Sequence, residues 1–326
     1  MSNCVYRLLA LCARAECDAA HHHQLGQAAA QLTDWAGVAA QAEAHGMAPL
    51  LYVHLKGAGV TLPLVIKREL QGLCLRHRHA NQVRTRVLCD VLTAYQVTGI
   101  PALVLKGAAL AHMVYPEPGL RPMSDMDILV PASEARRAQQ ALAGLGFEVP
   151  LPAGPASSHR HLAAATLHTE GLAISVEIHH RLFSDYFDQV IAYLASRILP
   201  VARLGTRAKI SGSLHDLTVP PRSFALGDLT AYTLGHEDML GHLCRHLTSH
   251  VNVWDFGRLI WVADIVSFSE RFVMEIDWER MRRWHPDVLD TLSLLHLMTP
   301  LSDALLSQAG IQIGRAPQGV GVEYQG

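Results

Sequence analysis

The stretch from residue 99 to residue 130 constrains the fold more than any other part of the chain. Residues 101–105 form a short apolar run after Gly99, which is typical of a buried strand. Residues 107–115 predict a helix of about two turns, and a proline-rich loop then leads to a second strand candidate at residues 125–130. Two strand candidates separated by a helix favour a mixture of helix and strand in this part of the chain, although a structural helical protein with an incidental Asp-x-Asp is a further alternative.

Helices are expected on both sides of this stretch. In the first hundred residues, apolar positions within 35–45 recur at a spacing near 3.6, and residues 65–95 contain few helix breakers. Gly46 is a plausible end for the first of these helices. Further along, Ser133 is a plausible N-cap for a helix over 133–145. Another strand and three more helices are expected, at residues 172–179, 236–250, 254–268 and 286–308.

These elements predict an α+β fold with a small mixed β-sheet. We expect a helical N-terminal region over residues 1–98 and a core over residues 99–200. A mostly helical C-terminal region would span residues 201–313, and residues 314–326, which are rich in glycine, would form a flexible tail.

Composition narrows the choice of partners and compartment. Lys and Arg number 27 against 29 Asp and Glu, so the formal charge of −2 argues against a broad nucleic-acid surface. The six cysteines show no CxxC spacing, which suits reduced thiols. Uncharged apolar runs of about 18 residues are absent, and the N-terminus lacks a signal-peptide core. We therefore expect a cytoplasmic protein with no membrane partner.

Two carboxylates dominate the strand at residues 125–130. Because side chains alternate along a strand, Asp125 and Asp127 point to the same face, roughly 7 Å apart. Hard oxygen ligands suit Mg²⁺, and two such ions stabilise the attacking and leaving oxygens of a displacement at phosphorus. We expect two Mg²⁺ ions at this pair. The alternative is that the Asp-x-Asp pair only caps a turn or a helix.

Residues upstream of this strand favour phosphate binding. A strand that ends at Lys106 and Gly107 and continues as a helix directs backbone N–H groups toward an anion. Glycine at position 107 lets the backbone approach a phosphate closely. The cations of Lys106 and Arg121 would offset phosphate charge, with Arg121 able to make a bidentate contact. Both cations could instead be solvated surface charges.

A third acid is expected on the strand at residues 172–179. Alternation places Ser175, Glu177 and His179 on one face of this strand. Glu177 would complete the metal site or accept the proton of a nucleophile. The alternative is that these side chains form an ordinary exposed strand face without a role in a site.

Histidines and tryptophans in the C-terminal third allow several interpretations. His242, His246 and His250 recur on one helix face, a spacing that permits zinc binding, although a supporting or acceptor-pocket role is the favoured interpretation. Trp254 and Trp261 are interpreted as core residues rather than a base-stacking platform.

The sequence resembles the uncharacterised nucleotidyltransferase family of the DNA polymerase beta-like superfamily. The resemblance rests on the strand, Lys-Gly and helix order followed by Arg-Pro-Met-Ser-Asp-Met-Asp-Ile-Leu-Val at residues 121–130. It continues, more weakly, through residues 176–180 and 242–250, the helix containing Asp264, and residues 276–281.

The resemblance implies a nucleotidyltransferase core and assigns site residues. Asp125, Asp127 and Glu177 would be the catalytic metal ligands, and Gly107 and Ser124 would lie near the nucleotide phosphates. The expected reaction moves an NMP group from an NTP, with ATP the expected nucleotide, to the hydroxyl or other nucleophile of an unidentified acceptor.

Two departures from the wider superfamily leave a second function open. Ala108 stands where a Ser or Gly usually follows Gly107, and the third acid is Glu177 rather than an aspartate. The alternative is a catalytically weak nucleotide-binding or partner-binding protein of the same fold, antitoxin-like or regulatory.

Overall fold

A computed structural model describes residues 3–150, 160–182, 217–250 and 257–312. Helices and strands are mixed, and helices flank a small mixed sheet of four strands, which confirms the expected α+β class. Among the described residues, no helix is both long enough and apolar enough to cross a membrane.

The four-stranded sheet brings the acidic strand to its centre. Its order is β1 (Leu103–Val104), β2 (Asp125–Leu129), β4 (Leu172–His179) and β3 (Ala165–Thr169). The β2 and β4 strands are parallel, whereas β1 and β3 pair antiparallel with their neighbours. Glu170 and Gly171 join β3 to β4 with φ of 47° and 74°, as a tight two-residue hairpin requires.

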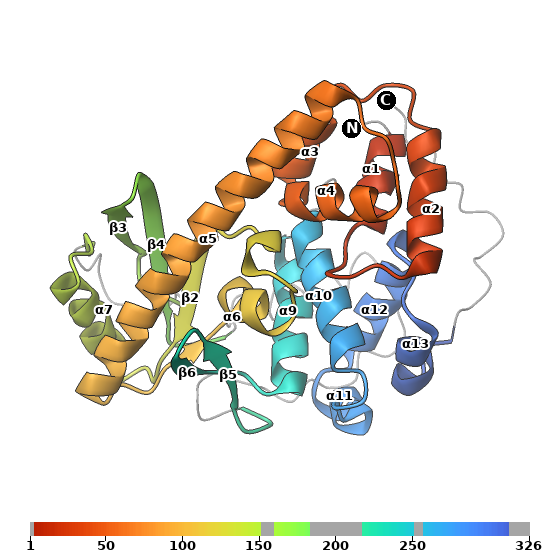
Figure 1. The fold of residues 1–326 in the computed structure, drawn as a ribbon. Coiled ribbons are helices and arrows are strands. Elements are labelled where there is room, and N and C mark those ends of the chain that lie inside the picture. The colour runs from red at the N-terminus through yellow and green to blue at the C-terminus, as the bar shows by residue number, and fades with distance from the viewer. Residues whose placement is uncertain (1–2, 151–159, 183–216, 251–256, 313–326) are drawn as a thin grey trace, which may run out of the picture.

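Five helices precede the sheet. They are α1 (Asn3–Leu11), α2 (Ala19–Ala30), α3 (Val38–Ala44), α4 (Ala48–Gly57) and the 35-residue α5 (Leu64–Thr98). The α5 helix runs diagonally from the N-terminal helices to α7 (Ala135–Gly144) beside the sheet (Figure 1). It ends where Gly99 adopts φ of 70°, a left-handed conformation that favours glycine at a helix end.

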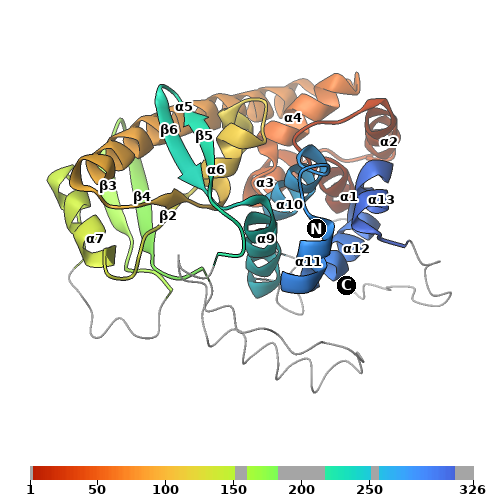
Figure 2. The same cartoon turned by 90° about the horizontal axis from the view of Figure 1, so that it is seen from below.

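The helix after β1 lies between the sheet and the C-terminal helices. This helix, α6 (Lys106–Met113), contacts β2 and also β5 (Arg222–Leu226), which pairs with β6 (Leu229–Thr233) as a separate two-stranded sheet. Figure 2 shows that small sheet beside α6 and α5. The 3-10 helix η1 (Pro118–Leu120) follows in the proline-rich loop and packs against α5.

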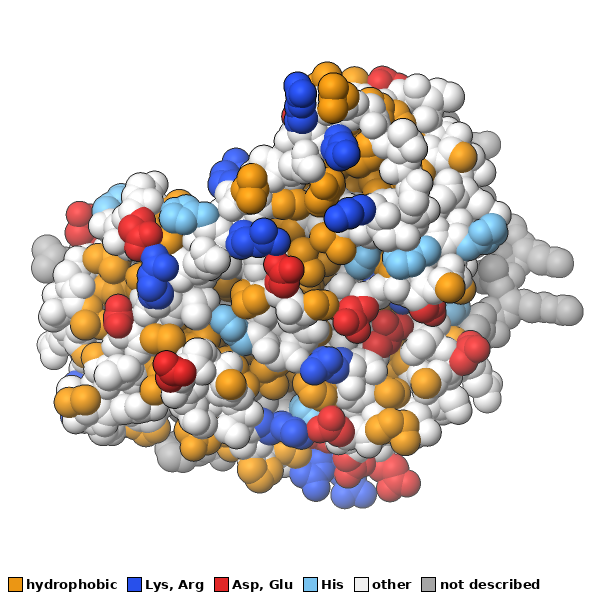
Figure 3. Space-filling model, in the orientation of Figure 1, with side chains coloured by type: hydrophobic (Ala, Val, Ile, Leu, Met, Phe, Trp, Pro, Cys, Tyr) orange, Lys and Arg blue, Asp and Glu red, His pale blue; other side chains and the backbone are white. Residues whose placement is uncertain are grey.

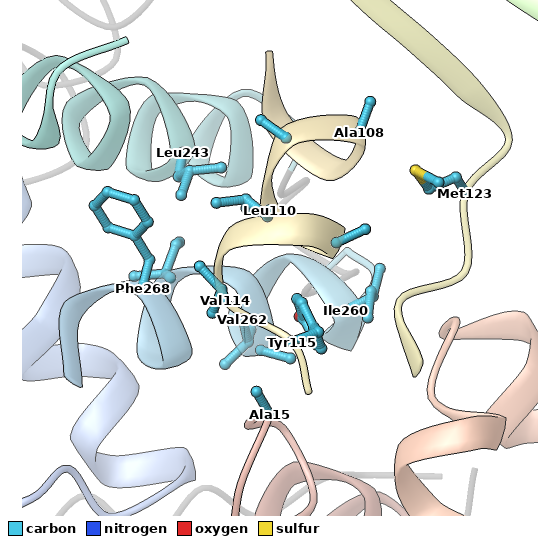
Figure 4. Packing of buried hydrophobic residues seen from close by; sticks show 14 of the residues in the cluster. Ala15, Ala108, Leu110, Val114, Tyr115, Met123, Leu243, Ile260, Val262 and Phe268 are labelled. Atoms are coloured by element: carbon cyan, nitrogen blue, oxygen red, sulfur yellow. The ribbon is translucent and has the colours of Figure 1, made fainter. Parts of the chain in front are cut away.

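The C-terminal third of the described chain is helical from α9 onward. Its helices are α9 (His236–His250), α10 (Leu259–Arg271), α11 (Trp278–Trp284), α12 (Asp287–Met298) and α13 (Asp303–Ala309). Buried side chains around α6, such as Leu110 and Val114, pack with Leu243 of α9 and Val262 of α10 (Figure 4). The apolar core is therefore continuous from the sheet region to the C-terminal helices.

Several expected elements differ in extent. The single helix expected over 286–308 is two helices, because Pro300 lacks the N–H that a continuous helix needs. Ser133 is not the N-cap of α7; Glu134 holds that position without a side-chain hydrogen bond. The strand expected over 101–105 is only two residues long.

Other boundaries shift by a few residues. The helix expected from residue 35 begins at Val38, after Gly37 with φ of 73°. The helix expected from residue 254 is described from Leu259, and residues 251–256 lie outside the described chain, as do residues 201–216 and the expected tail. The β3 strand was not expected.

Candidate active site

A cavity of about 220 Å³ lies where β2, β4 and α6 meet α9 and α10. All seven expected site residues line it: Lys106, Gly107, Arg121, Ser124, Asp125, Asp127 and Glu177. They come from three separate stretches of the chain, residues 106–107, 121–127 and 177, so only the folded chain brings them together. On the face drawn in Figure 3, Lys and Arg side chains lie scattered among other side chains, including Asp and Glu, and do not form a continuous basic surface.

Asp127 is a buried acid of the cavity and has two close partners. Its carboxylate is buried and lies 3.0 Å from the Lys106 ammonium and 2.8 Å from His179 Nε2. Burial alone would raise the pKa of Asp127, but the Lys106 charge and the hydrogen bond from His179 outweigh burial and hold the pKa well below its ordinary value. Asp127 is therefore ionised at neutral pH.

Glu177 faces Asp127 across the parallel pair of strands. The register places Glu177 directly opposite Asp127, and Glu177 Oε2 lies 3.6 Å from His179 Nε2. A hydrogen bond from His179 lowers the pKa of Glu177, although its partial burial works in the opposite direction. One ligand atom each from Asp127, Glu177 and His179 lie within 4.8 Å of one another, close enough to share a metal ion.

His179 connects the two carboxylates. Its side chain is 1% exposed, and burial by itself would lower the pKa of the ring. Its interactions with Asp127 and Glu177 outweigh burial and raise that pKa. The His179 ring is hydrogen-bonded to Asp127 at 2.8 Å and so orients that carboxylate at the cavity.

Asp125 occupies a different position from Asp127. It begins β2, is half-buried, and accepts a hydrogen bond of 3.2 Å from Ser124 Oγ. Its negative charge acts on the guanidinium groups of Arg84 and Arg258. Asp125 thus lies in the same cavity as Asp127, on the side that carries the arginines.

The start of α6 is strained at the cavity. Lys106 has φ of 45°, a conformation that non-glycine residues rarely adopt and that clusters at functional sites. The N-cap residue Leu105 supplies no side-chain hydrogen bond, so the first N–H groups of α6 are not capped by it. Such a helix start favours an anion.

Arg121 has a partner that the sequence did not suggest. Its guanidinium is buried and bonds both oxygens of Asp264 in α10, with Nε 3.2 Å from Oδ1 and Nη2 2.5 Å from Oδ2. Tyr115 donates a third hydrogen bond of 2.8 Å to the same carboxylate. The expected bidentate contact of Arg121 is therefore made to a carboxylate of this chain.

Gly107 is required by that arrangement. A Cβ at position 107 would overlap the Arg121 guanidinium, because the arginine passes directly against the first turn of α6. Glycine therefore serves the packing of Arg121 here, whatever it contributes to phosphate binding.

Aromatic rings form one wall of the cavity. The rings of His246 and His250 on α9 lie 4.9 Å and 5.0 Å from that of Trp261 on α10. Burial lowers the pKa of His246 to about 2, which leaves its imidazole neutral. Trp261 is half-buried and packs against the core, as expected, and it also lines the cavity.

The cavity also contains residues that sequence reasoning did not select. Arg160, His161 and Arg258 line it and add positive or titratable groups to those of Lys106. His161 Nδ1 lies 3.7 Å from Glu177 Oε2. No local pattern around these residues distinguishes them from surface charges, since each reaches the cavity only through tertiary packing.

The small mixed sheet thus presents carboxylates from the adjacent strands β2 and β4 beside the start of α6 and several cations. The model of a family described as uncharacterised nucleotidyltransferase matches residues 31–285, so the chain belongs to this family. Comparison with curated proteins and with solved structures gives no match.

Proposed function

We propose that the protein transfers an NMP group from an NTP, with ATP the expected nucleotide, to an acceptor nucleophile and releases pyrophosphate. The observation that carries this proposal is the register of β2 and β4, which sets Asp127 opposite Glu177 with His179 Nε2 2.8 Å from Asp127 and 3.6 Å from Glu177. Asp125 lines the same cavity and supplies a further carboxylate.

Two of the expected carboxylates, Asp127 and Glu177, lie close enough together to fit a divalent metal. Asp127 and Glu177 offer ionised oxygens within 4.8 Å of each other, the donor type that Mg²⁺ prefers. Asp125, Asp127 and Glu177 would hold the ions, with His179 orienting Asp127 through its 2.8 Å hydrogen bond. Bound Mg²⁺ would supply charge stabilisation at the phosphorus centre.

The negative charge of the phosphates would be offset by the Lys106 cation and by the N-terminal end of α6. Lys106 pairs with Asp127 in the free protein, and its flexible side chain can reach a triphosphate in the same cavity. Ser124 and the first N–H groups of α6 provide hydrogen-bond donors to phosphate oxygens. Arg121 acts differently: it fixes the loop before β2 against Asp264.

The proposed reaction is a displacement at the α-phosphorus of the NTP. An oxygen or nitrogen of the acceptor forms a bond to the α-phosphorus, and the bond from that phosphorus to the bridging oxygen of pyrophosphate breaks. The acceptor's proton passes to a base, and Glu177, which lines the cavity, would take this role where it does not hold a metal ion.

The aromatic wall suits a nucleobase. Imidazole and indole rings offer flat faces on which a base can stack. His246, His250 and Trp261 stand in the same cavity as the phosphate-binding cations, so one nucleotide can contact both.

A catalytically weak binding protein is the second candidate. It is favoured by the Lys106–Asp127 ion pair, which satisfies the central carboxylate without metal. The two candidates differ in turnover. We would measure NTP binding by thermal shift with Mg²⁺, and pyrophosphate release in the presence of cell extract as a source of acceptor.

Asp125→Asn is the variant for this experiment, and Asp90→Asn, on the exposed face of α5, is its matched control. Pyrophosphate release that depends on Asp125 but not on Asp90 supports the enzyme. Nucleotide binding without any release would leave the binding protein as the better account.

A further inference from the structure

A second cluster of metal-ligating side chains lies in the N-terminal helices, outside the cavity described above. Cys17 follows α1, His22 belongs to the first turns of α2, and His54 belongs to α4. One ligand atom from each of these residues, a thiol sulfur and two imidazole nitrogens, lies within 4.8 Å of the other two. Three separate segments therefore converge on one point.

His54 is oriented as a metal ligand requires. Its side chain is 3% exposed, and its Nε2 lies 2.8 Å from the carbonyl oxygen of Arg14. Because a carbonyl can only accept, Nε2 carries the proton and Nδ1 keeps its lone pair. Metal-bound histidines almost always donate their second N–H to a carbonyl or carboxylate in this way.

The fold also makes room for His22. Gly57 lies three residues after His54 on α4, and a Cβ at that position would be 2.7 Å from His22 Nε2. The imidazole of His22 therefore lies directly against the backbone of the helix that carries His54. Glycine is a poor helix residue, and here its absent side chain is what admits the ring.

We propose that Cys17, His22 and His54 bind one zinc ion. A thiolate with two imidazoles is a soft donor set that zinc accepts and Mg²⁺ does not. The adjacent Asp18 is engaged elsewhere: it caps α2 through the backbone N–H of His21 at 2.8 Å and bonds the ring of His21 at 2.7 Å. The fourth tetrahedral position is left to water or to an exogenous ligand.

This zinc site joins the N-terminal helices to the C-terminal ones. The Arg14 carbonyl that holds His54 belongs to a segment whose side chains reach α10. Arg14 bonds Glu270 at 3.5 Å and Thr299 at 2.9 Å, and the N–H of Ala15 donates to Ser267 at 2.7 Å. Zinc would fix the connection between α1 and α2 in the position that makes these contacts.

The test uses the full-length chain, stripped of metal and titrated with Co²⁺ as a spectroscopic substitute for zinc. A cobalt–thiolate bond produces a charge-transfer band that carboxylate ligands do not give, so the band reports a cysteine ligand and its loss in Cys17→Ser identifies that cysteine. We expect one equivalent of Co²⁺ to produce the band and zinc to remove it by displacement. We expect Cys17→Ser and His22→Gln to abolish tight binding.

Controls separate this site from the cavity and from loss of folding. Cys4→Ser changes an exposed cysteine of α1, and Asp127→Asn changes the cavity; both should keep the band. Zinc should raise the Tm of the wild type and not that of His22→Gln. Gly57→Ala, which removes no ligand, should weaken Co²⁺ binding at least tenfold. A missing band, or a band that survives in Cys17→Ser, would overturn the proposal.

Discussion

Arg121 and Asp264 form a buried, two-point ion pair between residues 143 positions apart in the chain. The pair ties the loop before β2 to α10, because Arg121 precedes the acidic strand by only a few residues. Asn81 of α5 secures the same loop from the other side by donating to the Arg121 carbonyl at 2.8 Å. Placement of Asp125 and Asp127 therefore depends on helices outside the sheet.

Breaking this pair should destabilise the protein strongly. Asp264→Asn leaves the buried Arg121 guanidinium without a counter-charge, and removing one partner of a buried pair costs about 3–5 kcal/mol. Urea unfolding measures the change. Glu117→Gln, which breaks the exposed ion pair with Arg78, is the control and should cost less than about 1 kcal/mol. Equal effects of the two variants would contradict the role given to Arg121.

Gly107→Ala should also destabilise the protein, although alanine is the better helix former. The new methyl group would overlap the Arg121 guanidinium, and overpacking of this kind costs about 1–3 kcal/mol. Gly72→Ala on α5 is the matched control, because a Cβ there meets nothing within 4 Å. That variant should gain about 0.5–1 kcal/mol. A stabilising Gly107→Ala would show that Arg121 does not pack against α6.

Loss of the indole at the cavity should weaken nucleotide binding. Trp261→Ala removes a stacking face worth about 1–3 kcal/mol, so Kd for the NTP should rise roughly 5- to 150-fold. Calorimetric titration with Mg²⁺ and each NTP provides the measurement. Trp284→Ala, at a partly exposed position ending α11, should leave Kd unchanged. An unchanged Kd in Trp261→Ala would show that the nucleobase does not stack on Trp261.

Acid should destabilise the fold partly through His242. Burial, together with the nearby Lys106 charge, holds the pKa of His242 well below its ordinary value. The unfolded chain binds this proton below about pH 6.5 and the folded chain does not, so the free energy of unfolding falls as pH drops. The contribution approaches about 1.4 kcal/mol per pH unit.

Urea unfolding between about pH 7 and pH 5 tests this linkage. The decrease in stability should be shallower in His242→Asn, and unchanged in His168→Asn, whose side chain is exposed on β3. If the free energy of unfolding of His242→Asn falls with pH as steeply as that of the wild type, the His242 imidazole is not the source of the pH dependence.

Local pattern predicted the elements that carry the acids. The strand at residues 172–179 and the helix at 236–250 match β4 and α9 in full, because alternation and helical spacing are strong there. Alternation also places Asp125 and Asp127 on one strand face, and both line the cavity. The edge strand β3 was missed because its residues are mostly half-exposed and lack a clear apolar face.

The remaining features depend on tertiary contacts that no local pattern encodes. A lone Asp264 in an apolar helix gives no sign of its distant partner Arg121. The heptad spacing of Trp254 and Trp261 is equally compatible with a core, and only the position of α10 turns Trp261 toward the cavity. The pairing register that sets Asp127 opposite Glu177 is likewise fixed by the whole sheet.

Label transfer tests the central claim most directly. Wild type and Asp127→Asn, each verified as folded, would be incubated with α-³²P-labelled NTPs, Mg²⁺ and cell extract, with Asp90→Asn as control. We expect the label to move to an acceptor in the wild type and in Asp90→Asn, and transfer by Asp127→Asn to fall to background. Transfer that persists at the wild-type rate in Asp127→Asn would contradict the assignment of this cavity as the active site.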